Sequence, residues 1–281
     1  MRGAAALALL ALAACDPQPH TVTVDLPAGA VGDAMKNTLS EALESKSHLP
    51  LTIKAQRPVT LTAADGVKVF ATDYRADRPR AVILLFHQAG SGKGEYADIG
   101  PRLAKMGYDA LAIDQRSGGD LYGPNATVKA LGTREPQPES AAYLSAEPDL
   151  QAAVDWAKRQ KLPIIVWGSS YSSSLAFPLA ARNPEVKAVL AFSPGEYFDD
   201  KALVETAATK LTVPVFVTSA SDAREVAEAA KIAHAVPGGR ATQFIPKAGV
   251  HGSSTLNASK NPKGAEDSWS AVTGFLRRVA P

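Results

Sequence analysis

The sequence lacks several features that would define a class of protein at once. Cys15 is its only cysteine, which excludes an intramolecular disulfide. Charges of the two signs nearly balance, with 30 lysines and arginines against 28 aspartates and glutamates, and no basic block predicts a nucleic-acid-binding surface. The apolar run at residues 4–14 is far shorter than the roughly 20 residues that a membrane-spanning helix needs.

The start of the chain is typical of an export signal. Arg2 precedes the apolar run, and the residues LAAC that end at Cys15 resemble the lipobox of bacterial lipoproteins. The resemblance implies a signal peptide over residues 1–14, a lipid on Cys15 and a bacterial cell-envelope protein anchored on the periplasmic side. The alternative is an ordinary cleaved signal that yields a soluble periplasmic or secreted protein.

One large domain follows a short N-terminal segment. Residues 15–54 contain a single helical pattern, and we expect a tether with a short accessory helix there. Residues 55–281 alternate apolar runs with helical patterns, after a hairpin signal at Asp65 and Gly66. This alternation predicts a mostly parallel central sheet with helices on both faces, and no insertion is large enough for a separate cap domain.

A long segment, residues 116–146, interrupts the alternation. It is rich in glycine, proline and serine and shows no clear periodicity. Because it follows the predicted strand YDALAID, it should emerge at the carboxyl edge of the sheet, where α/β proteins place their ligands. Four aromatic residues are candidates to line a binding pocket: Tyr122, Trp167, Tyr171 and Tyr197.

The stretch VWGSSYSSS, residues 166–174, holds five serines directly after an apolar run. In a strand-to-helix turn that exposes a nucleophile, the residues two before and two after the reactive one must be small. Ser170 meets this requirement with Gly168 and Ser172, whereas Ser169 has a bulky aromatic residue at both positions. Ser170 is therefore the candidate nucleophile.

This stretch resembles the G-x-S-x-G elbow of the α/β-hydrolase superfamily, with Ser172 in place of the second glycine. The resemblance implies the α/β-hydrolase fold and the chain order nucleophile, acid, histidine. Asp222 follows a later predicted strand and is the expected acid, and His251 follows the last one and is the expected base. Secondary candidates for the acid are Glu196, Asp199 and Asp200.

The segment HQAGSG resembles the loop that supplies the second donor of the oxyanion hole in this superfamily. The backbone N–H groups of Ala89 and Tyr171 are the expected donors, and His87 is expected to be structural. The same segment also resembles a phosphate-binding loop, but a P-loop requires glycine at His87 and serine or threonine at Gly94. No metal-ligand spacing is present, and we expect no metal and no cofactor.

The resemblance covers residues 55–281 and is closest to the dienelactone-hydrolase-like and esterase branches. It implies a serine hydrolase that cleaves carboxylic esters of small molecules through an acyl-enzyme. Dienelactone hydrolase itself has a cysteine nucleophile, so its substrate is not implied for Ser170. The alternatives are a peptidase or amidase with the same triad, and a non-catalytic binding protein tethered to the membrane. No nucleic-acid partner is expected.

Overall fold

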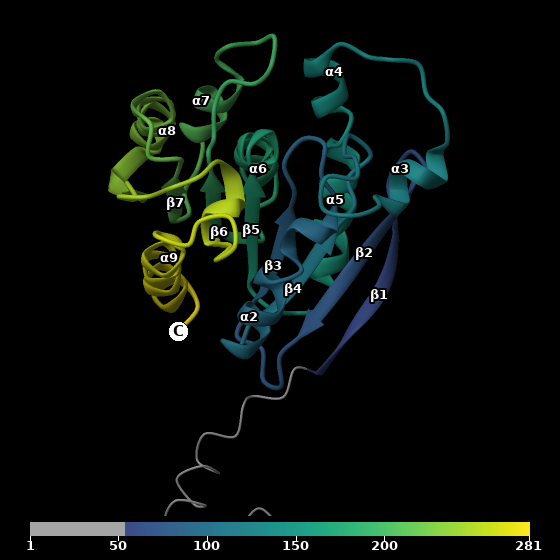
Figure 1. Cartoon of the computed structure of the whole chain (residues 1–281), viewed down its shortest axis with the longest axis horizontal. Coiled ribbons are helices and arrows are strands. Elements are labelled where there is room, and N and C mark those ends of the chain that lie inside the picture. The colour runs from purple at the N-terminus through teal and green to yellow at the C-terminus, as the bar shows by residue number, and fades with distance from the viewer. Residues whose placement is uncertain (1–53) are drawn as a thin grey trace, which may run out of the picture. The chain divides into compact units, whose positions relative to one another are not determined.

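One eight-stranded sheet runs through residues 54–281, the part of the chain that the computed structural model describes (Figure 1). The strand order is β1-β2-β4-β3-β5-β6-β7-β8. The pairs β1–β2 and β2–β4 are antiparallel and all other pairs are parallel, which confirms the predicted mostly parallel sheet. The strands are β1 (Lys54–Thr62), β2 (Lys68–Arg75), β3 (Val82–Phe86), β4 (Asp109–Ile113), β5 (Ile164–Ser169), β6 (Val186–Phe192), β7 (Val215–Thr218) and β8 (Ala241–Phe244).

The hairpin between β1 and β2 turns at the predicted place. Gly66 has a φ of +85°, a left-handed conformation that glycine adopts without the strain of a side chain. The Asp65 carboxylate accepts a hydrogen bond from the N–H of Val67 at 3.3 Å, as turn aspartates commonly do.

Helices cover both faces of the sheet, as predicted. Their bounds are α2 (Ile99–Lys105), α3 (Ala126–Leu131), α4 (Glu139–Leu144), α5 (Glu147–Lys158), α6 (Tyr171–Arg182), α7 (Leu203–Ala208), α8 (Ala223–Ala235) and α9 (Ala265–Val279). Three 3₁₀ helices are η1 (Lys93–Tyr96), η2 (Pro237–Gly239) and η3 (Gly252–Leu256). No helix within residues 54–281 is long and apolar enough to cross a membrane.

Strand β5 shows how one apolar run serves two cores. Ile164 and Val166 pack in the core beneath α5, α6 and α8, whereas Ile165 and Trp167 pack in the core beneath α2 and α9. Successive side chains of a strand point to opposite faces, so a strand buried on both faces must be continuously apolar. The architecture is therefore the α/β-hydrolase fold that the sequence predicted.

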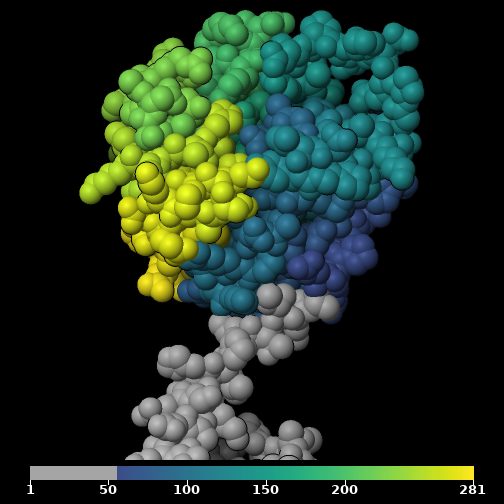
Figure 2. Space-filling view, viewed as in Figure 1, coloured from purple at the N-terminus to yellow at the C-terminus, as the bar shows by residue number. Residues whose placement is uncertain are grey.

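The segment 116–146 contains the short helices α3 and α4, which lie at the same end of the domain as α7 and α8 (Figures 1 and 2). The Arg116 guanidinium fixes its start through an ion pair with the buried Asp149 carboxylate at 2.7 Å. The expected signal peptide, the tether helix and Cys15 lie outside the described residues.

Candidate active site

The nucleophile candidate lies on a strained turn between β5 and α6. Ser170 has φ +57° and ψ −130°, a backbone conformation that residues with a side chain rarely adopt. A Cβ atom at Gly168 would lie 2.4 Å from the Cα of Ser173, so only glycine fits two residues before the turn. The structure thus places Ser170 on the tight strand-to-helix turn that the sequence indicated.

His251 contacts Ser170 directly. Its Nε2 lies 2.8 Å from the Ser170 Oγ, although the two residues are separated by 81 positions in the chain. The Ser170 residue is only 7% exposed, whereas the His251 side chain is 40% exposed at the edge of the site. With the ring proton on Nδ1, Nε2 accepts the hydrogen bond from the serine hydroxyl, which is the arrangement that a general base requires.

The third member of the arrangement is Glu225 and not Asp222. Glu225 Oε1 lies 2.7 Å from His251 Nδ1. The prediction that Asp222 contacts His251 is wrong, because Asp222 is the N-cap of α8 and its carboxylate accepts from the N–H of Glu225 at 3.1 Å. A capping carboxylate must point at the first turn of its own helix, so Asp222 cannot also reach the histidine.

The pattern D-x-x-E at residues 222–225 indicates the direction of the Glu225 side chain. In a capping box, the glutamate three residues after the N-cap turns back over the start of the helix. Glu225 turns back in this way but reaches beyond the N-cap, because its Oε2 accepts from the N–H of Ala220, two residues before Asp222, at 3.0 Å while Oε1 faces His251. The same turn of α8 therefore supplies both the cap and the histidine partner.

Glu225 is ionised in this environment. Burial raises the pKa of its carboxyl, but hydrogen bonds with His251, Ser193 and the N–H of Ala220 outweigh burial and lower the pKa to about 2. The other candidate acids lie elsewhere. Glu196, for example, accepts from the N–H groups of Val204 and Glu205 at the start of α7.

The loop after β3 contains Ala89, the expected second oxyanion donor. His87 is fully buried and fixes the loop, because Nδ1 donates to the carbonyl of Gln88 at 2.8 Å and Nε2 accepts from the N–H of Gln115 at 2.9 Å. Burial lowers the pKa of His87 to about 4, so the ring is neutral. Within the described residues, the N–H groups of Ala89 and Tyr171 donate to no other protein group.

Each of the remaining serines in the stretch 166–174 holds a different part of the site. The Ser172 hydroxyl donates to the carbonyl of His87, and the Ser173 hydroxyl donates to the carbonyl of Ser170 at 2.6 Å. The Ser174 hydroxyl donates to the carbonyl of Gly195 at 2.6 Å and accepts from its N–H at 3.0 Å. The serine-rich composition thus supplies small, buried hydrogen-bonding side chains at a crowded contact.

Ser169 contacts a residue that the sequence analysis missed, Glu95. The Ser169 hydroxyl donates to Glu95 Oε1 at 2.6 Å, and Glu95 Oε2 accepts from the N–H of Gln88 at 2.8 Å. No motif marks Glu95, because its position beside Ser169 depends on how the loop after β3 folds.

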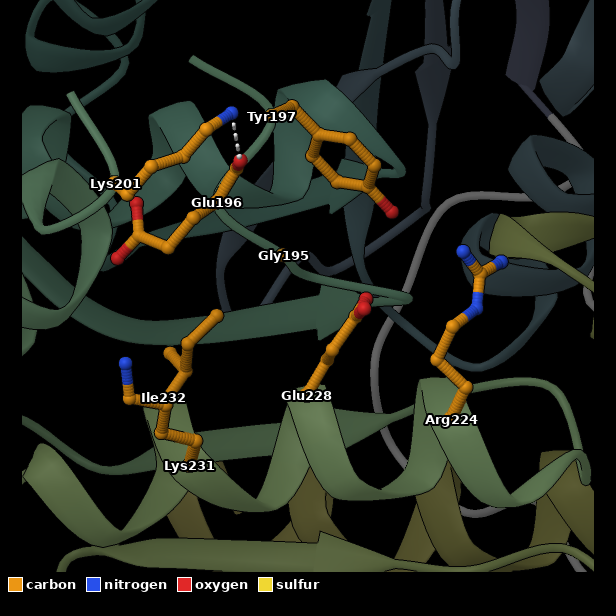
Figure 3. A pocket seen from close by; sticks show the side chains of 8 residues that line it. All are labelled: Gly195, Glu196, Tyr197, Lys201, Arg224, Glu228, Lys231 and Ile232. Carbon is orange, nitrogen blue, oxygen red and sulfur yellow. Dashed lines mark hydrogen bonds between the residues drawn. The ribbon is translucent and has the colours of Figure 1, made fainter. Parts of the chain in front are cut away.

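A pocket of about 410 Å³ lies between the loop after β6 and helix α8 (Figure 3). The Tyr197 hydroxyl donates to the carbonyl of Ser193 at 2.8 Å. Burial raises the pKa of this hydroxyl, and the nearby Ser170 side chain opposes that effect. The Glu228 carboxylate points from α8 toward Gly195 in Figure 3. The residues that line the pocket are Gly195, Glu196, Tyr197, Lys201, Arg224, Glu228, Lys231 and Ile232.

The other aromatic pocket candidates have different positions. Trp167 and Tyr171 are fully buried core residues, and they stack on Phe192 and Tyr143 with ring centroids 4.5 and 4.3 Å apart. The Tyr122 hydroxyl lies 2.6 Å from the Ser254 hydroxyl, on the loop that follows His251. Of the four candidates, only Tyr197 lines the pocket beside Ser170.

Comparison with known proteins gives the same fold. A dienelactone hydrolase from Anabaena variabilis ATCC 29413 aligns with a TM-score of 0.61 at 17% identity, covering 81% of this chain and 99% of the other. The esterase Pf2001 from Pyrococcus furiosus aligns with a TM-score of 0.59 at 20% identity, covering 81% and 92%. An acylaminoacyl peptidase from Pyrococcus horikoshii aligns with a TM-score of 0.61 at 14% identity, covering 85% of this chain but 43% of the peptidase.

Sequence comparison identifies the family. The chain is 28% identical over 123 residues to phospholipase YtpA from Bacillus subtilis (strain 168), a match that spans 43% of each protein. The model of the Dienelactone hydrolase family matches residues 68–280, which is nearly the whole described domain. The chain therefore belongs to the dienelactone hydrolase family, a group of hydrolases within the α/β-hydrolase superfamily.

Proposed function

We propose that this protein is a serine hydrolase that cleaves carboxylic esters. The observation that carries the proposal is the continuous line of hydrogen bonds from the Ser170 hydroxyl through His251 to Glu225, at 2.8 and 2.7 Å. His251 takes the proton of Ser170 as the hydroxyl attacks the ester carbonyl, and it then donates that proton to the leaving alcohol. Water activated by the same histidine cleaves the acyl-enzyme.

Glu225 orients the ring and stabilises the imidazolium. Because this carboxylate stays ionised well below neutral pH, it accepts from the Nδ1–H of His251 in both states of the ring. The proposal thus replaces Asp222 with Glu225 as the acid of the triad.

The N–H groups of Ala89 and Tyr171 form the proposed oxyanion hole. Tyr171 is the first residue of α6, so its N–H points out of the start of a helix, where the dipole favours negative charge. Loss of one such donor costs about 3 to 4 kcal/mol of transition-state stabilisation in a serine protease of unrelated fold.

The pocket beside Tyr197 takes one arm of the ester. Its volume of about 410 Å³ is sufficient for a chain or ring of moderate size. The Tyr197 ring and the buried Ile232 side chain line it together with five charged side chains, those of Glu196, Lys201, Arg224, Glu228 and Lys231. We assign the apolar surface of Tyr197 and Ile232 to the substituent of the ester.

The proposal is tested by labelling the purified protein with a fluorophosphonate and by assaying p-nitrophenyl esters against aryl amides. We expect an adduct on Ser170, ester turnover, and the loss of both in Ser170→Ala. Faster turnover of the amides would instead favour a peptidase or amidase. The absence of both an adduct and turnover would indicate a non-catalytic binding protein.

A further inference from the structure

Glu95 is a buried carboxylate beside the triad that the proposed mechanism does not use. It lies in η1 and is only 5% exposed. Burial of a carboxylate is costly unless hydrogen bonds compensate for the lost water. Such a residue therefore requires a structural or functional reason for its position.

The hydrogen bonds of Glu95 connect three segments of the active site. Oε2 accepts from the N–H of Gln88, the residue before the proposed oxyanion donor Ala89, at 2.8 Å. Oε1 accepts from the hydroxyl of Ser169, the residue before Ser170, at 2.6 Å. The same hydroxyl accepts from the N–H of Ser253, two residues after His251, at 2.8 Å. One carboxylate thus links the oxyanion loop, the nucleophile turn and the histidine loop.

We propose that Glu95 is a positioning residue that must be ionised for full activity, because only the carboxylate accepts from both the Gln88 N–H and the Ser169 hydroxyl while that hydroxyl accepts from the Ser253 N–H. The inference rests on the proposed serine-hydrolase function. Both oxygens of Glu95 face donors, and the Gln88 N–H cannot reverse its direction. We place the proton of the neutral form on Oε1, facing Ser169, because Oε2 keeps the hydrogen bond from the Gln88 N–H.

Protonation at that place disrupts the contact. Ser169 Oγ would then accept from both Glu95 and the N–H of Ser253, and its own proton would lose its acceptor. Ser169 is fully buried, so water cannot supply a replacement. The displaced hydroxyl belongs to the residue directly before the nucleophile.

Burial of Glu95 makes this change accessible near neutral pH. Burial raises the pKa of Glu95 to about 7, against the opposing effects of its hydrogen bonds and of His251. The other titratable groups that face it are Tyr96 and Tyr171, whose pKa values burial raises and which stay neutral. An ionised Glu95 also favours the positively charged His251 that forms when Ser170 loses its proton.

The test compares the wild type with Glu95→Gln, whose amide reproduces the hydrogen bonds of the protonated acid. The rate constant of Ser170 labelling by a fluorophosphonate is measured between about pH 5 and 9 and requires no knowledge of the natural substrate. We expect Glu95→Gln to label about 10- to 100-fold more slowly than the wild type at high pH. The two rates should converge at low pH, where the wild type is protonated at Glu95. Glu185→Gln, an exposed carboxylate on the protein surface, is the matched control.

The result separates positioning by the ionised form from a merely structural role. A ratio of the two rates that stays constant across the pH range, or equals one throughout, would overturn the inference while leaving the serine hydrolase intact. No adduct on wild-type Ser170 would overturn both. If Glu95→Gln does not fold, the pH dependence of Ser170 labelling in the wild type tests the inference by itself. The acid limb of its labelling rate should reach a slope of about two if Glu95 must be ionised in addition to the general base, and a slope that stays near one contradicts the role of Glu95.

Discussion

Glu225 Oε1 lies 2.7 Å from His251 Nδ1, while Asp222, three residues earlier, caps the helix that carries Glu225. The two carboxylates follow the same strand, yet they point in different directions. Their roles are therefore separable by mutation.

Glu225→Gln should reduce kcat by about 10³- to 10⁴-fold, because the amide neither fixes the productive ring tautomer nor stabilises the imidazolium. Asp222→Asn should stay within about threefold of the wild type, since asparagine is an equally good N-cap. Ester hydrolysis by the two purified variants checks both expectations. A larger loss in Asp222→Asn than in Glu225→Gln would return Asp222 to the triad.

The error over Asp222 shows where sequence reasoning stops. The position of Ser170 was predictable because the turn requires small residues two positions before and two positions after the nucleophile, here Gly168 and Ser172. Which of two acids reaches a histidine depends on side-chain direction at the start of a helix. That direction is visible in the sequence only if the D-x-x-E pattern is interpreted as a capping box.

The sheet was predictable for a similar reason, and Glu95 was not. Strands such as β3 are buried on both faces, and their continuous apolar runs indicate this without any knowledge of their neighbours. Glu95 reaches Ser169 across 74 positions of sequence, through an irregular loop and one turn of η1. No periodicity reports such a contact.

The serines that flank the nucleophile should differ in importance. Ser173→Ala removes a hydroxyl that donates to the Ser170 carbonyl, but that carbonyl still accepts from the N–H of Ser173 at 2.8 Å. We expect kcat/KM within about fivefold of the wild type and a stability loss of about 1 kcal/mol. Ser169→Ala leaves the Ser253 N–H and Glu95 Oε1 without their partner.

For Ser169→Ala we expect kcat/KM to fall by at least about tenfold more than in Ser173→Ala. Steady-state ester hydrolysis and urea unfolding of the two variants measure the effects on activity and stability separately. Equal activity in the two variants would contradict the role assigned to Ser169. The sequence does not separate the two serines in this respect, because it does not show the partners of their hydroxyls.

Glu95 should also affect the pH dependence of stability. Its pKa is raised to about 7 by burial, so between its unfolded value and about 7 the folded protein holds a proton that the unfolded chain has lost. Folding stability contributed by this group is therefore present at low pH and falls as the pH rises. The ionised carboxylate that the active site requires therefore lowers the stability of the folded state.

Urea unfolding of the wild type and Glu95→Gln at about pH 5 and pH 8 measures this effect. The free energy of unfolding of the wild type, relative to the variant, should fall by on the order of 3 kcal/mol across that range. The comparison of the wild type with Glu225→Gln should have the opposite sign at lower pH. The pKa of Glu225 is lowered in the folded state, so its ionised form stabilises the fold above the unfolded pKa, and this stabilisation is lost as the pH falls toward about 2. If the difference in free energy of unfolding between the wild type and Glu95→Gln does not change with pH, the pKa of Glu95 is not raised.

The lipobox resemblance at Cys15 gives a prediction about location. We propose that the mature protein carries lipid on Cys15 and is held at the bacterial envelope, since several acyl chains on one residue contribute about 0.8 kcal/mol per buried methylene. Expressed in a bacterium, the wild type should sediment with membranes, and Cys15→Ser should remain with its signal uncleaved or appear in the soluble fraction. Detection of a mature soluble protein from the wild type would favour the ordinary cleaved signal.

The pocket beside Tyr197 should determine how long an acyl chain the enzyme accepts. Glu228 is exposed on α8 and its carboxylate points across the pocket toward Gly195 (Figure 3), so Glu228→Trp fills the space without disturbing the core. We expect KM to rise about tenfold or more for p-nitrophenyl octanoate, with little change for the acetate, because a short chain does not enter the pocket. Lys210→Trp, in a separate surface groove beside α7, is the matched control and should change neither constant. Equal effects of Glu228→Trp on the two esters would mean that the acyl chain binds elsewhere. The segment 116–146, at the same end of the domain, would then be the next place to test.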